Sequence, residues 1–174
     1  LLAAVRATGV PTVVVLMSGR PLTITQEAAQ TAALLEAWFP GVEAGHAVAD
    51  VLFGDVNPGA KLPVSFPRAL GQVPLHYDAK STGRPADPND RFTSRYLDEA
   101  NEALFPFGHG LSYTTFSLDG LRLSAAVIPP DGRLTVHVDV TNTGRTAGDE
   151  VVQLYIQDVA SSVTRPVREL AGFQ

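Results

Sequence analysis

The sequence contains no cysteine. This absence excludes disulfide bonds, thiolate chemistry and cysteine-based zinc sites. It does not identify a compartment, because both cytosolic proteins and exported proteins without disulfides can lack cysteine. The four histidines add no metal motif, since none has ligand spacing with another and no His-Glu-x-x-His pattern occurs. We therefore expect no metal site in this chain.

The chain also lacks long hydrophobic runs and any excess of positive charge. Its apolar runs are far shorter than the roughly 20 residues that a transmembrane helix needs. Lys and Arg number 13 against 18 Asp and Glu, which gives a net charge of −5. When the chain is divided at Gly110, the net charge is −3 up to that residue and −2 after it, so neither half is basic. We therefore expect neither nucleic acid nor a membrane among its partners.

No initiator methionine and no charged leader region open the chain. The first residues, LLAAVRATG, are helix-forming and end in a glycine that suits a helix terminus. We interpret them as the end of a helix rather than as a signal peptide. The sequence is therefore expected to come from the middle of a longer polypeptide.

Apolar residues make up 45% of the chain and the mean hydropathy is +0.09, which is enough for a folded core. In the first half, Thr12–Met17 is a β-branched run typical of a strand buried on both faces. Glu43–Phe53 has the apolar spacing of a helix. The other expected elements are a helical turn, a strand for which a helix stays open, and a proline-flanked edge strand, at Thr25–Thr31, Ala33–Phe39 and Leu62–Phe66. This alternation predicts a βαβ arrangement with a parallel or mixed sheet.

A long polar loop at 71–101 and a short apolar connector at 104–116 follow. Structureless loops of this length are usually functional or disordered, and the arginines and aromatic residues of this one indicate that it is held against something. The connector, LFPFGHGLSYTTF, sets large apolar residues around one proline and two glycines. We interpret it as a rigid seam between two domains rather than a surface loop. Five of its side chains are expected to be largely buried: Phe105, Phe107, Leu111, Tyr113 and Phe116.

Downstream of the seam, apolar and polar residues alternate with a period of two. The alternation is clearest in Leu134–Val140 and Val152–Ile156, and turns rich in Gly, Pro and Asp separate the runs. This pattern is typical of a β-sandwich. Only 59 residues run from Phe116 to Gln174, whereas a seven-strand sandwich needs roughly 100. We therefore expect the last strands of the sandwich to be missing.

Four stretches, in order and covering nearly the whole chain, closely resemble glycoside hydrolase family 3, the family of β-glucosidases and related exo-glycosidases. They are Val13–Leu22, Ala37–Pro67, Thr93–Phe116 and Val140–Asp158. Within the family, the sequence is most similar to the bacterial periplasmic β-glucosidases. One departure is visible, because Gly59-Ala60 stands where the family usually has Ser-Gly.

The resemblance implies the fold class and the domain limits. An incomplete α/β sandwich-type domain would occupy residues 1–103, including the loop at 71–101. The seam at 104–116 would lead to an incomplete all-β fibronectin type III-like sandwich at 117–174. The parent protein would be a periplasmic or secreted β-glucosidase that hydrolyses terminal non-reducing β-D-glucosyl residues with retention and without a cofactor.

No residue of this chain matches a catalytic residue of the family. In the enzymes it resembles, the nucleophile is an Asp of an N-terminal barrel, and the acid/base Glu lies on a segment before the helix that ends at Thr8. The chain alone is therefore expected to be inactive. Four residues are candidates for substrate binding, by position after a strand or by the aromatic and charged groups that sugars need: Arg20, Arg95, Tyr96 and Asp98. Two other roles stay open: Arg20 could bond loop carbonyls or a neighbouring acid, and Arg95 and Asp98 could pair with each other and only hold the loop in place.

The expected partners follow from the same resemblance. They are β-linked glucosides or oligosaccharides, the N-terminal barrel and remaining sandwich strands of the same polypeptide, and a second copy of the chain in a homodimer. The alternatives are a non-catalytic carbohydrate-binding module and a purely structural or interaction module, in which the sandwich only braces its neighbour.

Overall fold

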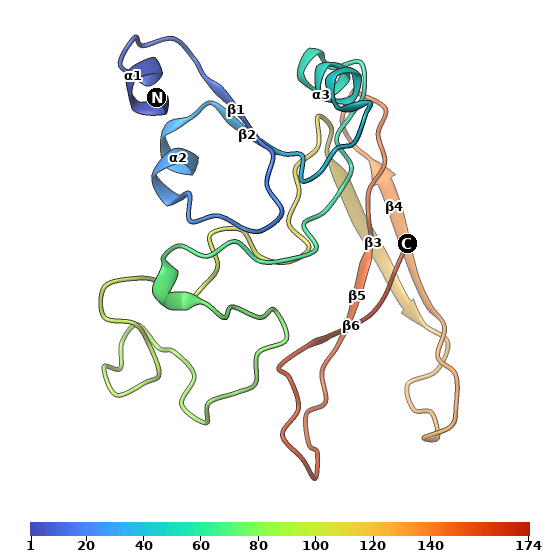
Figure 1. The fold of residues 1–174 in the computed structure, drawn as a ribbon. Helices are drawn as coiled ribbons and strands as arrows, with labels where there is room; N and C mark the ends of the chain where they lie inside the picture. The colour runs from blue at the N-terminus through green and yellow to red at the C-terminus, as the bar shows by residue number, and fades with distance from the viewer.

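The computed structural model describes all residues from Leu1 to Gln174, and its first third has the expected βαβ arrangement (Figure 1). The elements in chain order are α1 (Leu2–Arg6), β1 (Val13–Leu16), α2 (Thr25–Gln30), β2 (Ala33–Glu36) and α3 (Ala44–Phe53). Strands β1 and β2 pair in parallel, with Val13 opposite Ala33 and Leu16 opposite Glu36. The helices and strands predicted in this part are confirmed, including a strand rather than a helix at β2.

Helix α3 ends where its sequence predicts. Gly54 follows it with φ of 85°, in the left-handed region, and its N–H bonds to the Val51 carbonyl. Glycine adopts this conformation without the steric cost that a Cβ atom would add. With ten residues α3 is the longest helix, and no helix is long and apolar enough to cross a membrane.

The predicted edge strand at Leu62–Phe66 is wrong. This segment forms one isolated bridge, between Phe66 and Phe105, and does not join the β1–β2 sheet. Its backbone pairs instead with the connector, since the Phe66 N–H donates to the Phe105 carbonyl at 2.8 Å and the Leu62 N–H donates to the His109 carbonyl at 2.8 Å. Between these two bonds the Phe107 N–H donates to the Ser65 hydroxyl at 3.0 Å and not to a backbone carbonyl, which interrupts the ladder.

The last third forms two separate antiparallel pairs of strands. Strand β3 (Phe116–Leu123) pairs with β4 (Val136–Asn142), and β5 (Gln153–Ile156) pairs with β6 (Glu169–Phe173). The alternating runs predicted strands at β4 and β5, and both are confirmed. Strands β3 and β6 were not predicted from the alternation. Each contains a glycine and each lies in a ladder that shifts register, so the period of two is interrupted.

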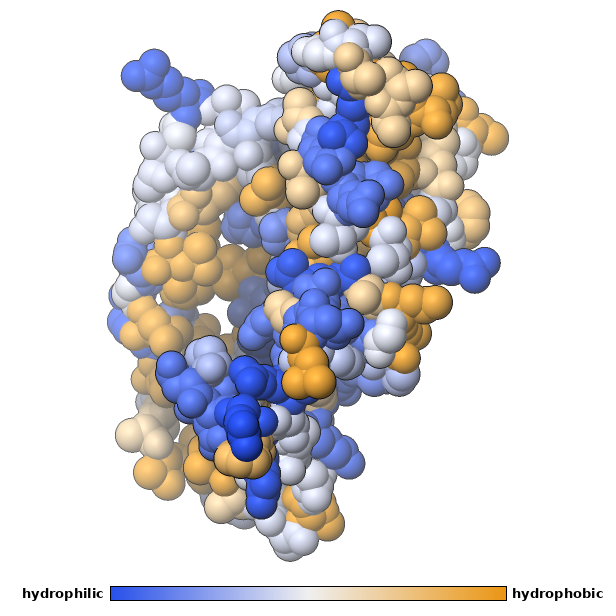
Figure 2. All heavy atoms as spheres, turned by 90° about the vertical axis from the view of Figure 1, so that its left-hand side faces the viewer, coloured by the Kyte–Doolittle hydropathy of each residue, from blue (hydrophilic) through white to orange (hydrophobic).

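Little of the chain is fully buried. Phe66 is the most buried large side chain, at 2% exposed, and it packs against the rings of Trp38 and Phe105 at 5.9 and 6.2 Å between centroids. The accessible surface is 12744 Å², whereas a compact monomer of this mass exposes roughly 8,200 Å². Figure 2 shows hydrophobic side chains open to the surface on the face that carries α1, α2 and the 71–101 loop.

The five seam side chains are less buried than expected. Leu111 is 77% exposed and Tyr113 is 49% exposed, whereas Phe105, Phe107 and Phe116 are half-buried. The Tyr113 hydroxyl donates to the Val51 carbonyl of α3 at 2.6 Å, which ties this exposed side chain to the helix. The seam is thus held partly by polar contacts rather than by apolar burial alone.

Candidate functional site

The loop at 71–101 closes at its base through one buried side chain. Gln72 lies in the 3₁₀ turn η1 (Leu70–Gln72) and is 3% exposed. Its Oε1 accepts the Arg68 N–H at 2.6 Å, and its Nε2 donates to the Ala100 carbonyl at 2.8 Å. A buried amide with partners for both its donor and its acceptor is costly to displace. The two ends of the loop are therefore held together.

The tip of the loop is ordered by short side-chain turns rather than by regular structure. The Asp87 carboxylate accepts the Asn89 N–H at 2.8 Å, and the Asp90 carboxylate accepts the Phe92 N–H at 2.8 Å. The Ser94 N–H crosses the tip to the Arg84 carbonyl at 3.0 Å. Asp and Asn stabilise such turns by bonding their own backbone two residues on. This chemistry explains how a segment without periodicity keeps a defined shape.

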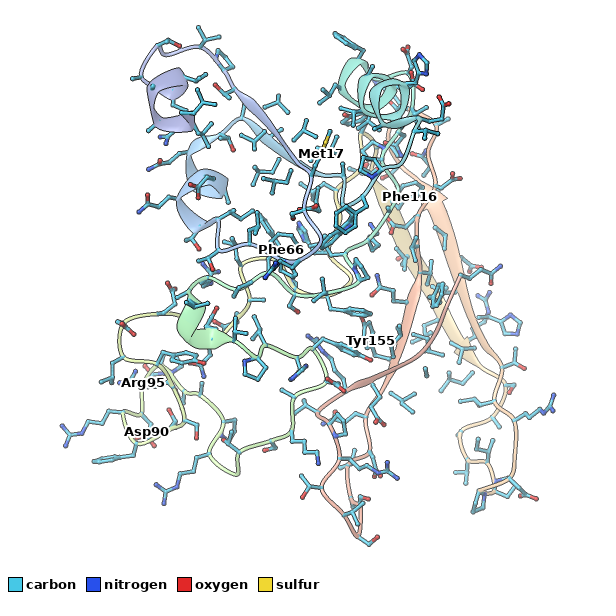
Figure 3. The ribbon with its side chains drawn as sticks, in the orientation of Figure 1. Met17, Phe66, Asp90, Arg95, Phe116 and Tyr155 are labelled. Atoms are coloured by element: carbon cyan, nitrogen blue, oxygen red, sulfur yellow. The ribbon has the colours of Figure 1, made fainter.

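Two shallow hollows flank residues 86–88 on this tip. The first is lined by Arg84, Pro85, Ala86, Asp87, Pro88, Asp90, Phe92 and Thr93. The second has a volume of about 520 Å³ and includes three of the predicted binding residues, Arg95, Tyr96 and Asp98. Figure 3 shows the side chain of Arg95 on this projecting tip, away from the strands. The structure thus brings these three residues to one surface.

Arg95 and Asp98 form no ion pair, so this pair does not hold the loop in place. Asn101 does this instead. Its Oδ1 accepts the Tyr96 N–H at 3.0 Å, and its Nδ2 donates to the Ser94 carbonyl at 2.8 Å. Sequence reasoning missed Asn101, although an amide with both a donor and an acceptor is well suited to tie two backbone groups.

Arg20, the fourth predicted residue, lies elsewhere. It follows β1, its side chain is exposed, and it lines neither hollow. The Ser18 hydroxyl donates to the Arg20 carbonyl at 2.9 Å, which closes a turn after the strand. Arg20 therefore belongs to the carboxyl edge of the β1–β2 sheet and not to the loop.

Glu36 lies at that same carboxyl edge and was not predicted as a functional residue. Its Oε1 accepts the Trp38 N–H at 2.9 Å, and its Oε2 is buried without a partner. Trp38 has a positive φ of 51°, which is rare and strained for a bulky residue. Burial raises the pKa of the Glu36 carboxyl, and its backbone hydrogen bonds from Trp38 and Ser18 oppose that rise.

We expect Glu36→Gln to stabilise the protein at neutral pH. A carboxyl whose pKa is raised in the folded state stabilises the fold at low pH, and this contribution is lost as the pH rises through the folded pKa. The variant should therefore gain in melting temperature over the parent as the pH increases from 4 to 7. Melting curves across this range test it, with Asp131→Asn, an exposed acid that forms no ion pair, as the control. A gain that does not depend on pH would contradict the assignment.

No group of three or more His, Cys, Asp or Glu side chains is placed to hold a metal ion. His46 instead lies 3.0 Å from Glu43 at the surface. His109 stacks on the ring of Phe105 at 5.2 Å between centroids, and burial together with the charge of Lys61 lowers its pKa. These histidines therefore have structural partners.

The comparisons with known proteins agree with this architecture. Residues 1–113 match the glycosyl hydrolase family 3 C-terminal domain, and residues 150–174 match the fibronectin type III-like domain. These matches confirm the expected fold class, an incomplete α/β domain followed by an incomplete all-β sandwich. The chain belongs to glycosyl hydrolase family 3.

Its relatives carry glycosidase names. The chain is 53% identical over its full length to a periplasmic β-glucosidase of Salmonella typhimurium, and 46% identical over its full length to a β-xylosidase of Formosa agariphila. Among solved structures, the β-glucosidase of Listeria innocua in complex with isofagomine aligns over 98% of this chain, with a TM-score of 0.93 and 44% identity. A D270A mutant of that enzyme was solved in complex with laminaribiose. The chain spans only 23% of each of the two curated relatives and 24% of the solved chain.

Proposed function

We propose that this chain is the C-terminal portion of a β-glucosidase that hydrolyses terminal non-reducing β-D-glucosyl residues with retention and without a cofactor. The observation that carries the proposal is the 53% identity over the whole chain to a protein named as a periplasmic β-glucosidase. The same name supports a periplasmic or secreted location. The assignment concerns the longer protein, because this chain spans about a quarter of its relatives.

Within that enzyme, this chain supplies a scaffold and part of the sugar site. Arg95, Tyr96 and Asp98 line one hollow on an ordered loop. Aromatic rings can stack on the flat faces of pyranose sugars, and Arg and Asp can bond hydroxyl groups in a fixed geometry. Arg20 is a further candidate, at the carboxyl edge of the β1–β2 sheet where ligands of open α/β sheets bind.

The partners of the chain are the barrel and the remaining sandwich strands of the same polypeptide, together with a second copy in a homodimer. The support is the accessible surface of 12744 Å² and its many exposed hydrophobic side chains. The domain limits we propose are 1–103, 104–116 for the seam and 117–174. Each of the two parts leaves sheet edges unpaired, which a neighbour would cover.

The sugar contacts are tested by Arg95→Ala and Tyr96→Ala in the longer protein. Loss of a hydrogen bond from a charged group costs about 1.5–3 kcal/mol, so the KM for a β-linked glucose disaccharide should rise at least about tenfold in Arg95→Ala. Arg133→Ala is the matched control, because Arg133 is an exposed arginine of the sandwich that lies far from the loop in sequence, lines neither hollow and forms no ion pair. An unchanged KM in both loop variants would remove this loop from the sugar site.

A second candidate function is cleavage of β-xylosides, which the identity to a β-xylosidase favours. The two sugars differ by one hydroxymethyl group, so binding alone separates them only modestly. Side-by-side kcat/KM values of the longer protein on aryl β-glucoside and aryl β-xyloside decide between them. Sugar binding with no turnover of either substrate would favour the non-catalytic carbohydrate-binding alternative, and neither binding nor turnover would favour the structural one.

A further inference from the structure

Tyr77, in the first limb of the 71–101 loop, is enclosed by aromatic side chains from two other parts of the chain. Its ring stacks on Phe107 of the seam, with 4.2 Å between centroids and an interplanar angle of 17°. Its ring also meets Tyr155 of β5 edge-on, at 6.2 Å and 69°. Aromatic pairs in these geometries are favourable beyond the area that they bury.

Backbone contacts join the same limb to the approach and start of β6. The Val167 N–H donates to the Ala79 carbonyl at 3.0 Å, and Lys80 forms an isolated antiparallel bridge with Pro166. The Leu170 N–H points to the Tyr77 hydroxyl oxygen at 3.4 Å. The first limb of the loop thus lies beside a segment that is nearly ninety residues further along the chain.

Tyr155, the β5 residue that meets the Tyr77 ring, is itself held in place. The guanidinium of Arg168 lies over the Tyr155 ring, 5.8 Å from its centroid. The Tyr155 hydroxyl donates to Gln153 at 2.6 Å, and the Gln153 amide donates to the Gly108 carbonyl of the seam at 3.1 Å. In Figure 3, Tyr155 lies on the side of β5 that faces the loop. The sandwich therefore presents a supported aromatic surface to Tyr77.

We propose that Tyr77 is a positioning residue through which the β5–β6 sheet holds the loop that carries the sugar-binding side chains. Gln72 clamps the base of this loop, and Tyr77 ties its first limb to the sandwich. Arg95 and Tyr96 lie beyond these two attachments, so their place depends on both. The role assigned to Tyr77 rests on the sugar contacts proposed above, and it gives the sandwich a part in substrate binding.

The test uses the longer protein with Tyr77→Ala, Tyr77→Phe and, as a control, Tyr113→Ala. Tyr113 is a seam tyrosine whose hydroxyl bonds to α3, so its loss affects stability without touching the loop. A misplaced binding group can cost up to about a hundredfold. We expect Tyr77→Ala to raise the KM for laminaribiose about tenfold with little change in kcat, and to speed hydrogen exchange of residues 84–101. Tyr77→Phe keeps the ring contacts and should stay within about twofold of the parent.

Hydrogen exchange separates this inference from the sugar contacts. Faster exchange at 84–101 in Tyr77→Ala, absent from Tyr113→Ala, together with the raised KM supports the proposal. Unchanged exchange overturns the anchoring role. Faster exchange with an unchanged KM overturns the positioning role if Arg95→Ala raises the KM. If Arg95→Ala also leaves the KM unchanged, the sugar contacts themselves fail, and Tyr77 anchors a loop with another purpose.

Discussion

The 174-residue chain by itself is expected to release no product from an aryl β-glucoside above the buffer background. Retaining glycosidases of the common type need two carboxyl groups about 5–5.5 Å apart. In the family that the chain belongs to, the resemblance places the nucleophile on a barrel and the acid/base on a segment before α1. We therefore propose that neither role falls on a residue of this chain. General acid–base catalysis alone is worth about 10²–10⁴-fold in rate, so loss of both groups leaves nothing measurable.

The assay compares the purified chain with the longer protein at equal molar concentration, and far-UV circular dichroism confirms that the chain has folded. A folded chain that turns over the substrate within about a hundredfold of the longer protein would contradict the assignment of both catalytic groups to other segments. Loss of activity in an unfolded sample would not count, because any enzyme loses activity when it unfolds. The circular dichroism spectrum is therefore part of the test.

Lys61→Met is expected to cost the longer protein about 3–5 kcal/mol of folding free energy, the range for breaking one partner of a buried ion pair. The Lys61 ammonium lies 2.8 Å from the Glu150 carboxylate, with side chains only 14% and 17% exposed. The ammonium also donates to the Gly110 carbonyl at 3.0 Å. One side chain thus joins the α/β part, the seam and the sandwich. Its removal leaves the Glu150 carboxylate without its cation partner in a largely dry site.

The double variant Lys61→Met/Glu150→Met is the matched control for this prediction. It removes both charges, so it should recover much of the stability that Lys61→Met loses. Urea unfolding of the parent, both single variants and the double variant gives the coupling energy. Arg122→Met is a second control, because its ion pair with Asp139 is exposed and exposed pairs contribute little. Equal losses of folding free energy in Lys61→Met and Arg122→Met would show that the junction of the α/β part, the seam and the sandwich does not depend on Lys61.

The glycines of the junction illustrate what a motif can and cannot reveal. The sequence indicates a tight, close-packed backbone at Gly108 and Gly110, but it does not show which segment packs against it. In the structure, a Cβ atom on Gly110 would clash with the Ala60 carbonyl oxygen. Gly59, at the position where the family usually has Ser, would bring a Cβ atom to 3.0 Å from the Asp149 carbonyl oxygen. Gly110 is therefore needed for close approach between segments, whereas a Cβ atom on Gly59 would require the Asp149 backbone to shift by only a few tenths of an ångström.

Local patterns were enough for the strands and helices of the first third and for β4 and β5, because periodicity and end residues act over a few neighbouring positions. They were also enough for the class of the protein, through several long motifs in order. The tertiary structure alone decided the rest. The segment Leu62–Phe66 pairs with the seam and not with the sheet, Asn101 and not Asp98 ties the loop tip, and Tyr77 meets β5. These contacts join residues far apart in sequence, and the free energy of packing and hydrogen bonding between such residues leaves no periodic trace along the chain.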